Sequence, residues 1–336
     1  MTSEVRPLRS DELENWFDFL ARAFAEKGTP RTYFVSHVKN DPWMDVGGVL
    51  GAFCDEGTLA STLRIFVRRT YINGSAHLTG GIGEVSTHPS YRNRGLSAAL
   101  LSEALEWMNA RSYSLSMLHS SRLPIRQIYA RRGWKTVPVQ YTTARISKIL
   151  LKSQRSSFLL DFHNGEHVKM IMELYLKKAP ILNGAIVRDS EDYWRLWIQH
   201  EMNRRSAIAI GLAAAEKSSI LISYIIAGLQ SSGGVEVYEY ISERNDKGTY
   251  LSLLHDVVMR LNDGGVSLEV TSPDCMVPRA WVESFSDECC SSKDEGCMYR
   301  IIGRPENSAV ENFVNQRFTP TTGEIPKTMF SKLDSI

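Results

Sequence analysis

The stretch Val85-Ser86-Thr87-His88-Pro89-Ser90-Tyr91-Arg92-Asn93-Arg94-Gly95-Leu96-Ser97 is the most informative part of this chain of 336 residues. It begins inside a strand-like run at residues 81–87, passes a proline turn and enters a basic loop. Apolar residues then recur with helical spacing from Leu96 to Met108. Strand, basic glycine loop and helix in this order are typical of a phosphate-binding site. The first-turn amides of a helix lack acceptors within the helix, and the helix dipole favours negative charge there.

Single residues of the loop favour the same kind of ligand. Gly95 carries no Cβ, so the backbone can come close to a bound group. Arg92 and Arg94 add positive charge and fork-shaped donors. The alternative is an ordinary strand, turn and helix with two surface arginines.

This segment resembles motif A of the GNAT superfamily of acyl-CoA N-acyltransferases. The loop of that motif reads Arg/Gln-x-x-Gly-x-Gly/Ala, and residues 92–97 match it except at Ser97, which is small and keeps its amide. The resemblance implies acetyl-CoA as the acyl donor, with its pantetheine arm paired along Val85, Ser86 and Thr87. It also implies pyrophosphate binding by Asn93, Arg94, Gly95, Leu96, Ser97 and Ala98. Arg92 either reaches a phosphate or faces solvent.

Composition limits the classes of partner. A net charge of +1 and a pI near 7.7 give no electrostatic argument for nucleic acid or a membrane surface. Residues 1–6 lack an apolar signal core, and no apolar run approaches membrane-spanning length. The five cysteines are odd in number and irregularly spaced, which favours free thiols over disulfides or a metal site. We expect a cytoplasmic protein that binds no metal.

The length predicts two α/β units. Residues 1–150 form the first unit, and the strand at residues 137–148 is expected to complete its sheet. Residues 158–300 repeat the α/β pattern, but the loop at residues 243–248 carries two acidic groups where a phosphate would dock. Residues 301–336 form a C-terminal extension, which should pack on the body because Met329, Phe330 and Leu333 need burial.

The whole arrangement resembles the Eis-like (enhanced intracellular survival type) branch of the GNAT superfamily. Members carry an active N-terminal GNAT domain, a degenerate second copy and a C-terminal part. The fold class is therefore α/β (α+β), with tandem mixed sheets flanked by helices. Members often end in a sterol-carrier-like domain, for which this chain has no room. The resemblance also includes four further segments, at residues 5–12, 39–43, 128–134 and 192–194.

The chemistry that the resemblance implies is direct attack of an amine on the acetyl-CoA thioester. Such a reaction needs a base for the amine, an acid for the leaving thiolate and a donor for the developing oxyanion. Tyr129 is implied as the acid, and the alternative is a packing tyrosine. The candidates for the base are Glu84, then the terminal carboxylate of Ile336, then His119. His88 lies in the turn and is expected to be structural.

Alternation along the strand places Glu84 and Ser86 on one face of the sheet, and Val85 and Thr87 on the other. We expect the acceptor to be an amine-bearing small molecule or a lysine side chain, and self-association is left open. The rival hypothesis is a non-catalytic, regulatory acyl-CoA-binding protein. A further variant of the enzyme hypothesis is a longer acyl-CoA donor.

Overall fold

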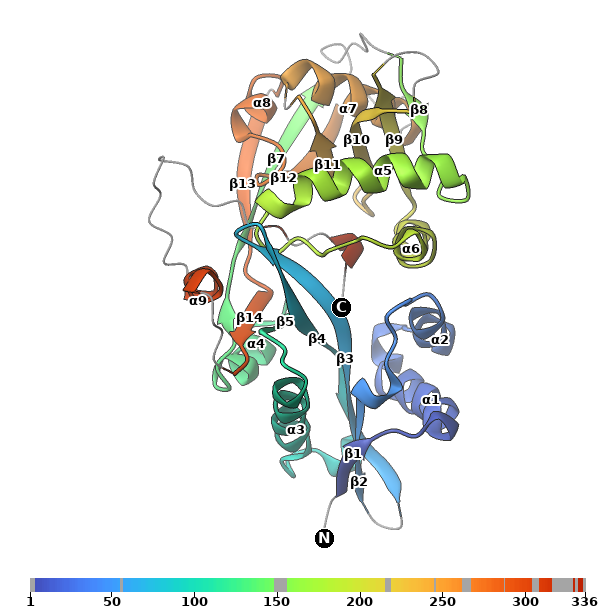
Figure 1. Ribbon diagram of the computed structural model, residues 1–336, viewed down its shortest axis with the longest axis vertical. Helices are drawn as coiled ribbons and strands as arrows, with labels where there is room; N and C mark the ends of the chain where they lie inside the picture. The colour runs from blue at the N-terminus through green and yellow to red at the C-terminus, as the bar shows by residue number, and fades with distance from the viewer. Residues whose placement is uncertain are drawn as a thin grey trace.

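The computed structural model describes residues 4–54, 57–147, 156–214, 219–244, 246–261, 267–286, 288–303, 308–315, 329 and 332–334. Within these ranges the strands build two mixed sheets of seven strands each. Figure 1 shows the two sheets, each with its helices, in the lower and upper halves of the molecule. The structure therefore confirms a mixed α/β fold with two sheet-based halves.

The first sheet has the strand order β1-β2-β3-β4-β5-β14-β6, and β4 and β5 pair in parallel while the other neighbours are antiparallel. Its strands are β1 (Glu4–Pro7), β2 (Val49–Cys54), β3 (Thr58–Ile72), β4 (Ser75–Thr87), β5 (Leu115–His119), β14 (Cys297–Ile301) and β6 (Lys135–Thr136). Its helices are α1 (Leu13–Ala23), α2 (Arg31–Lys39), α3 (Leu96–Ala110) and α4 (Leu123–Ala130). Helices α1 and α2 lie on one side of this sheet and α3 on the other (Figure 1).

Local sequence explains how these elements form. Asn73 and Gly74 connect β3 to β4 with φ of 49° and 83°, the left-handed pair that a two-residue hairpin requires. The apolar stripe of α3 is buried against the sheet, from Leu96 to Met108. Helix α1 buries Trp16 and its apolar neighbours against the opposite face.

The second sheet has the order β13-β7-β12-β11-β10-β9-β8. Its strands are β13 (Glu288–Asp294), β7 (Val139–Ser147), β12 (Ser267–Pro273), β11 (Val235–Ser242), β10 (Leu221–Leu229), β9 (Ala207–Ala213) and β8 (Phe158–Leu159). The helices of this half are α5 (Gly165–Lys178), the π-helix Tyr193–Ile198, α6 (Gln199–Arg204), α7 (Lys247–Leu261) and α8 (Arg279–Glu283).

The expectation that residues 137–148 complete the first sheet is wrong. Strand β7 pairs with β12 and β13 of the second sheet, and β14 inserts between β5 and β6 of the first. Alternation in a sequence indicates a strand but not its partner, so this exchange could not be predicted from the local pattern. Each sheet is completed by a strand from the other half. The domain limits at residues 150, 158 and 300 stay a prediction, and residues 148–155 lie outside the described ranges.

The C-terminal residues pack onto the junction between the halves. Met329 and Leu333 are fully buried, as predicted, whereas Phe330 lies outside the described residues. Helix α9 (Ser308–Asn315) sets Phe313 edge-on against Tyr299 of β14. None of the described helices is long and apolar enough to cross a membrane. The five cysteines are all free thiols.

Candidate active site

The basic loop leads into an open helix N-terminus. Gly95 precedes α3 with a left-handed φ of 77°, and no side-chain cap occupies this end of the helix within the described chain. A Cβ built on Gly95 would meet no atom within 4 Å. The first-turn amides of Leu96, Ser97 and Ala98 therefore face a site without a capping carboxylate from the described residues, which suits an anionic ligand.

The arginines of the loop differ in their contacts. The Arg94 guanidinium donates to the Ser90 carbonyl at 3.0 Å and lies 4.9 Å from the Tyr91 ring centroid. Arg94 thus stiffens its own loop. Arg92 and Asn93 are exposed, and Asn93 also has a left-handed φ, of 62°.

The matching helix of the second half is closed to anions. At the start of α7, Asp246 accepts hydrogen bonds from the Thr249 amide at 2.8 Å and from the Thr249 hydroxyl at 2.6 Å. A carboxylate of the chain itself therefore lies where a phosphate would dock. This contrast with α3 agrees with the prediction that the second copy does not bind the cofactor.

Strands β4 and β5 stay together only over a short distance. Thr79–Gly81 of β4 pair with Leu115–Met117 of β5, and no further ladder pairs join the two strands in the described structure. Val85, Ser86 and Thr87 follow on the part of β4 that has left β5. On their other side, Ser86 and Thr87 stay paired with Thr62 and Ser61 of β3. The β5-facing edge at residues 85–87 is thus positioned to pair with an extended ligand chain.

Glu84 lies at a β-bulge where the strands separate. The register passes from Arg64↔Gly83 to Thr62↔Ser86, so Glu84 and Val85 together oppose one residue of β3. Glu84 has a left-handed φ of 53°, which is uncommon for a residue with a Cβ. Val85 packs on the α3 side, whereas the Glu84 carboxylate faces Arg64 and His37.

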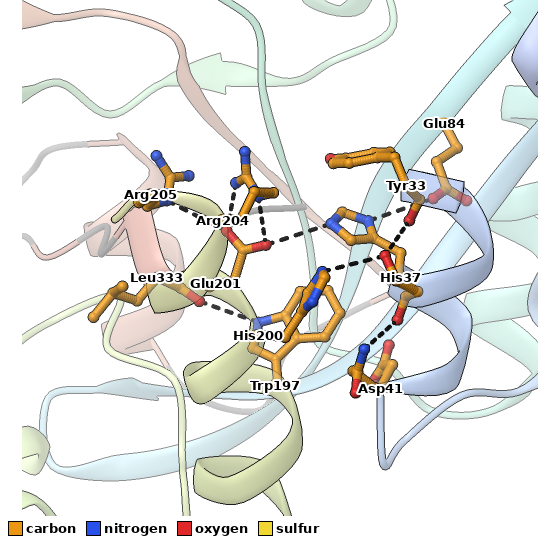
Figure 2. Close-up of polar contacts among 12 residues, drawn as sticks. Tyr33, His37, Asp41, Glu84, Trp197, His200, Glu201, Arg204, Arg205 and Leu333 are labelled. Carbon is orange, nitrogen blue, oxygen red and sulfur yellow. Dashed lines mark hydrogen bonds and ion pairs between the residues drawn. The ribbon is translucent and has the colours of Figure 1, made fainter. Parts of the chain in front are cut away.

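Figure 2 shows that Glu84 belongs to a buried charged cluster shared by the two halves of the chain. Its Oε1 lies 3.6 Å from Nδ1 of His37 in α2 and 3.8 Å from a terminal nitrogen of Arg64 in β3. The other ring nitrogen of His37, Nε2, lies 3.4 Å from Glu201 in α6. The side chains of Glu84, His37 and Glu201 are 7%, 3% and 0% exposed.

This cluster has unused hydrogen-bonding capacity. Within the described chain, neither carboxylate oxygen of Glu84 and neither ring nitrogen of His37 has a hydrogen-bond partner. Buried polar groups are normally paired, so the unpaired atoms of Glu84 and His37 make this cluster a candidate for binding a ligand or moving a proton. Burial lowers the pKa of His37, but the contacts with Glu201 and Glu84 outweigh it and leave that pKa above its ordinary value.

Comparisons with known proteins agree with this geometry. Residues 4–137 match the family model described as an acetyltransferase (GNAT) domain. This part of the chain is therefore similar to a GNAT domain. No match is found among the sequences of curated proteins.

Solved structures extend the likeness to both halves. A GCN5-related N-acetyltransferase from Anabaena variabilis is 15% identical with a TM-score of 0.67, over 90% of this chain and 73% of that one. Eis1 from Mycobacterium abscessus is 17% identical with a TM-score of 0.62, over 90% and 74% of the two chains. The N-myristoyltransferase of Saccharomyces cerevisiae with bound myristoyl-CoA is 12% identical with a TM-score of 0.56, over 89% and 82%. The chain therefore has a GNAT fold of the Eis-like kind.

Tyr129 lies in α4 on the α3 side of the first sheet. It is 8% exposed, meets Trp134 edge-on at 5.9 Å and shares one apolar cluster with Leu96 and Val85. Burial raises the pKa of Tyr129 to about 12, so the phenol stays protonated at neutral pH. This position is compatible with a proton donor beside the bound thioester and with a packing role.

The other candidates from the sequence take different places. His119 ends β5 and its Nε2 lies 3.0 Å from Oδ2 of Asp294 in β13. Nδ1 of His88 accepts from the Ser90 amide at 3.3 Å, which agrees with its expected role in the turn. Ile336 lies outside the described residues.

Two groups of side chains come close enough to share a cation. His119, Asp294 and Cys297 offer ligand atoms within 4.8 Å of one another, although Cys297 is fully buried. His37, His200 and Glu201 do so as well, but Arg204 and Arg205 already hold the Glu201 carboxylate, which marks an ion-pair cluster. The expectation that the protein binds no metal stays a prediction.

Sequence reasoning missed most of the buried charges. Arg64 and Arg68 are fully buried on β3 and both pair with Asp41, at 2.7 Å and 3.0 Å. Their spacing on either side of Phe66 was the available signal, because it puts all three on one strand face. His37 and Glu201 carried no signal, since only the fold brings them together.

A cavity of about 460 Å³ adjoins the buried Arg68 of β3. It is lined by residues at the C-terminal end of α3 and the start of β4, among them Trp107, Arg111 and Leu78. The basic loop is at the opposite end of α3, so this cavity is separate from the proposed donor site.

Proposed function

We propose that the chain is an N-acetyltransferase that moves the acetyl group of acetyl-CoA to an amine. The acceptor is an amine-bearing small molecule or a lysine side chain. The observation that carries this proposal is the edge of β4 at residues 85–87, which has left β5 and leads through the basic loop to the uncapped α3. Residues 1–150 would supply the chemistry, with residues 158–300 as a degenerate copy and residues 301–336 as an extension.

The donor would lie along this edge. Backbone groups of Val85, Ser86 and Thr87 would pair with the pantetheine arm, and the amides of residues 93–98 would hold the pyrophosphate, with Arg92 nearby. With the pyrophosphate at residues 93–98 and the pantetheine arm along residues 85–87, the thioester would lie where β4 and β5 begin to separate, next to Glu84.

The reaction then needs two proton movements. The amine nitrogen attacks the thioester carbonyl carbon, a C–N bond forms and the C–S bond breaks. Glu84 takes the proton that the amine loses, directly or through a water molecule. Tyr129, whose phenol is protonated at neutral pH, gives that proton to the leaving thiolate and regains one from solvent. Glu84 is the first candidate for the base, ahead of the terminal carboxylate of Ile336 and of His119.

Tyr129→Phe should lower turnover by about a hundredfold while leaving acetyl-CoA binding unchanged, because only the donated proton is lost. Thiol release measures turnover and calorimetry measures binding. The matched control is Tyr113→Phe, which removes the hydroxyl of another buried tyrosine, beside Trp107 at the far end of α3. Equal rates for Tyr129→Phe and the wild type would assign Tyr129 to packing alone.

The proposal also specifies the acyl group of the donor and the cellular location of the protein. The donor carries an acetyl group rather than a longer chain, and the free thiols of all five cysteines support a reducing, cytoplasmic location. A series of acyl-CoA donors of increasing length, assayed with one accepted amine, tests the preference for acetyl.

A further inference from the structure

We propose that the second half of the chain takes part in the proton transfer: Glu201 anchors the imidazole of His37, and His37 holds the Glu84 carboxylate in place at the bulge. His37 and Glu201 are then positioning residues, and Glu84 is the group that meets the substrate. This inference rests on the proposed function, and it gives the degenerate copy a role in it.

The geometry of the cluster points to such a link. The imidazole of His37 lies between two carboxylates from different halves, with Nδ1 toward Glu84 and Nε2 toward Glu201, as Figure 2 shows. Glu201 is fixed from its other side by Nε of Arg204 at 2.9 Å and Nε of Arg205 at 3.4 Å. A change at Glu201 can therefore reach Glu84 through one side chain.

Polar or charged groups reach His37 from its own helix, from β3 and from α6, whereas the π-helix packs the Trp197 ring on it at 5.2 Å. From its own helix, the Tyr33 ring lies 4.1 Å away by centroids. Strand β3 contributes Arg64, which also contacts Glu84. Helix α6 contributes His200, whose ring centroid is 5.7 Å away, and Arg204, which pairs with Glu201. The two carboxylates are the groups in ion-pair range of the ring, so they favour its charged form.

A charged His37 serves the proposed base in two ways. With Arg64 it presents positive charge to the Glu84 carboxylate, at 3.6 Å from His37 and 3.8 Å from Arg64. In the step itself, an N–H bond of the amine breaks and an O–H bond forms on Glu84, while His37 keeps both of its own protons. The neutral carboxyl group then faces two cations, which favours release of the proton to solvent.

Glu201→Gln tests the link because it keeps the shape of the side chain and removes its charge. His37 should then lose its proton more readily, and ionised Glu84 should lose a neighbouring cation. We expect the acidic limb of the pH profile of kcat/KM to move up by about one pH unit, with an unchanged KM for acetyl-CoA. Glu236→Gln is the matched control, since Glu236 is a buried carboxylate of the same half that pairs with Lys332 instead.

Arg204→Gln supplies a second variant with the opposite sign. Arg204 is 32% exposed, so its loss is milder for folding than a change at the buried Glu201. Without Arg204 the Glu201 charge acts more fully on His37, and the acidic limb should move to lower pH. The inference would be overturned if both variants fold and the acidic limbs of their kcat/KM profiles coincide with that of the wild type.

A measurement without turnover separates this inference from the proposed function. The ring signals of the eight histidines can be followed against pH by NMR, with His37 assigned from the loss of its signal in His37→Gln. The inference expects the His37 titration to move down in Glu201→Gln and up in Arg204→Gln, and unmoved titrations would overturn it. A wild type that acetylates no amine would instead overturn the proposed function.

Discussion

Arg188→Met is expected to lower the free energy of unfolding by about 3–5 kcal/mol, because it leaves two buried carboxylates without their partner. Arg188 is fully buried and contacts Glu239 at 2.9 Å and Asp334 at 2.7 Å. Burial opposes its charge, but these two carboxylates outweigh burial and raise the pKa of Arg188 well above its ordinary value. Urea unfolding at neutral pH measures the loss.

The control for this prediction is Arg279→Met. Arg279 is exposed and pairs with Glu283 one turn along α8, so its loss should cost less than about 1 kcal/mol. In Arg188→Met the loss should shrink as the pH falls, because protonation of Glu239 and Asp334 removes the uncompensated charge. Equal losses for the two variants, or a loss that does not change with pH, would contradict this account of the junction.

Gly95→Asp should weaken acetyl-CoA binding by roughly a hundredfold, since it places a carboxylate where the pyrophosphate would bind. Space is not the obstacle, because a Cβ on Gly95 meets no atom within 4 Å. Aspartate also tolerates the left-handed φ of 77° better than most residues do. Calorimetry with acetyl-CoA measures the change.

Gly95→Asn is the matched control for charge. Asparagine has nearly the same shape and tolerance for this backbone conformation, but it carries no charge. We expect Gly95→Asn to lose much less affinity than Gly95→Asp. The same large loss in both would assign the effect to the backbone, and unchanged binding in both would place the pyrophosphate elsewhere.

Predictions from local patterns agreed with the structure. Asn73-Gly74 forms the hairpin, the periodic apolar residues form α3, and the glycine loop before it is open to an anion. The acidic loop of the second half indeed places a carboxylate, that of Asp246, at the start of α7. Each of these features depends on neighbours within a few residues, which a sequence displays directly.

Features that depend on distant segments could not be predicted. The exchange of β7 and β14 between the sheets depends on which strands pair, and the alternation of side chains does not indicate the pairing partner. The bulge at Glu84 depends on the register with β3, and the contact of His37 with Glu201 joins helices from different halves. Glu84 was found as a candidate, but its buried partners were not.

The most direct test of the central claim is release of free thiol from acetyl-CoA by the wild type with a panel of amines, beside Glu84→Gln. The account predicts amine-dependent release with mass-verified acetylation of one or more acceptors, and its loss in Glu84→Gln although acetyl-CoA still binds. Tight acetyl-CoA binding without amine-dependent release would contradict it and favour a non-catalytic acyl-CoA-binding protein.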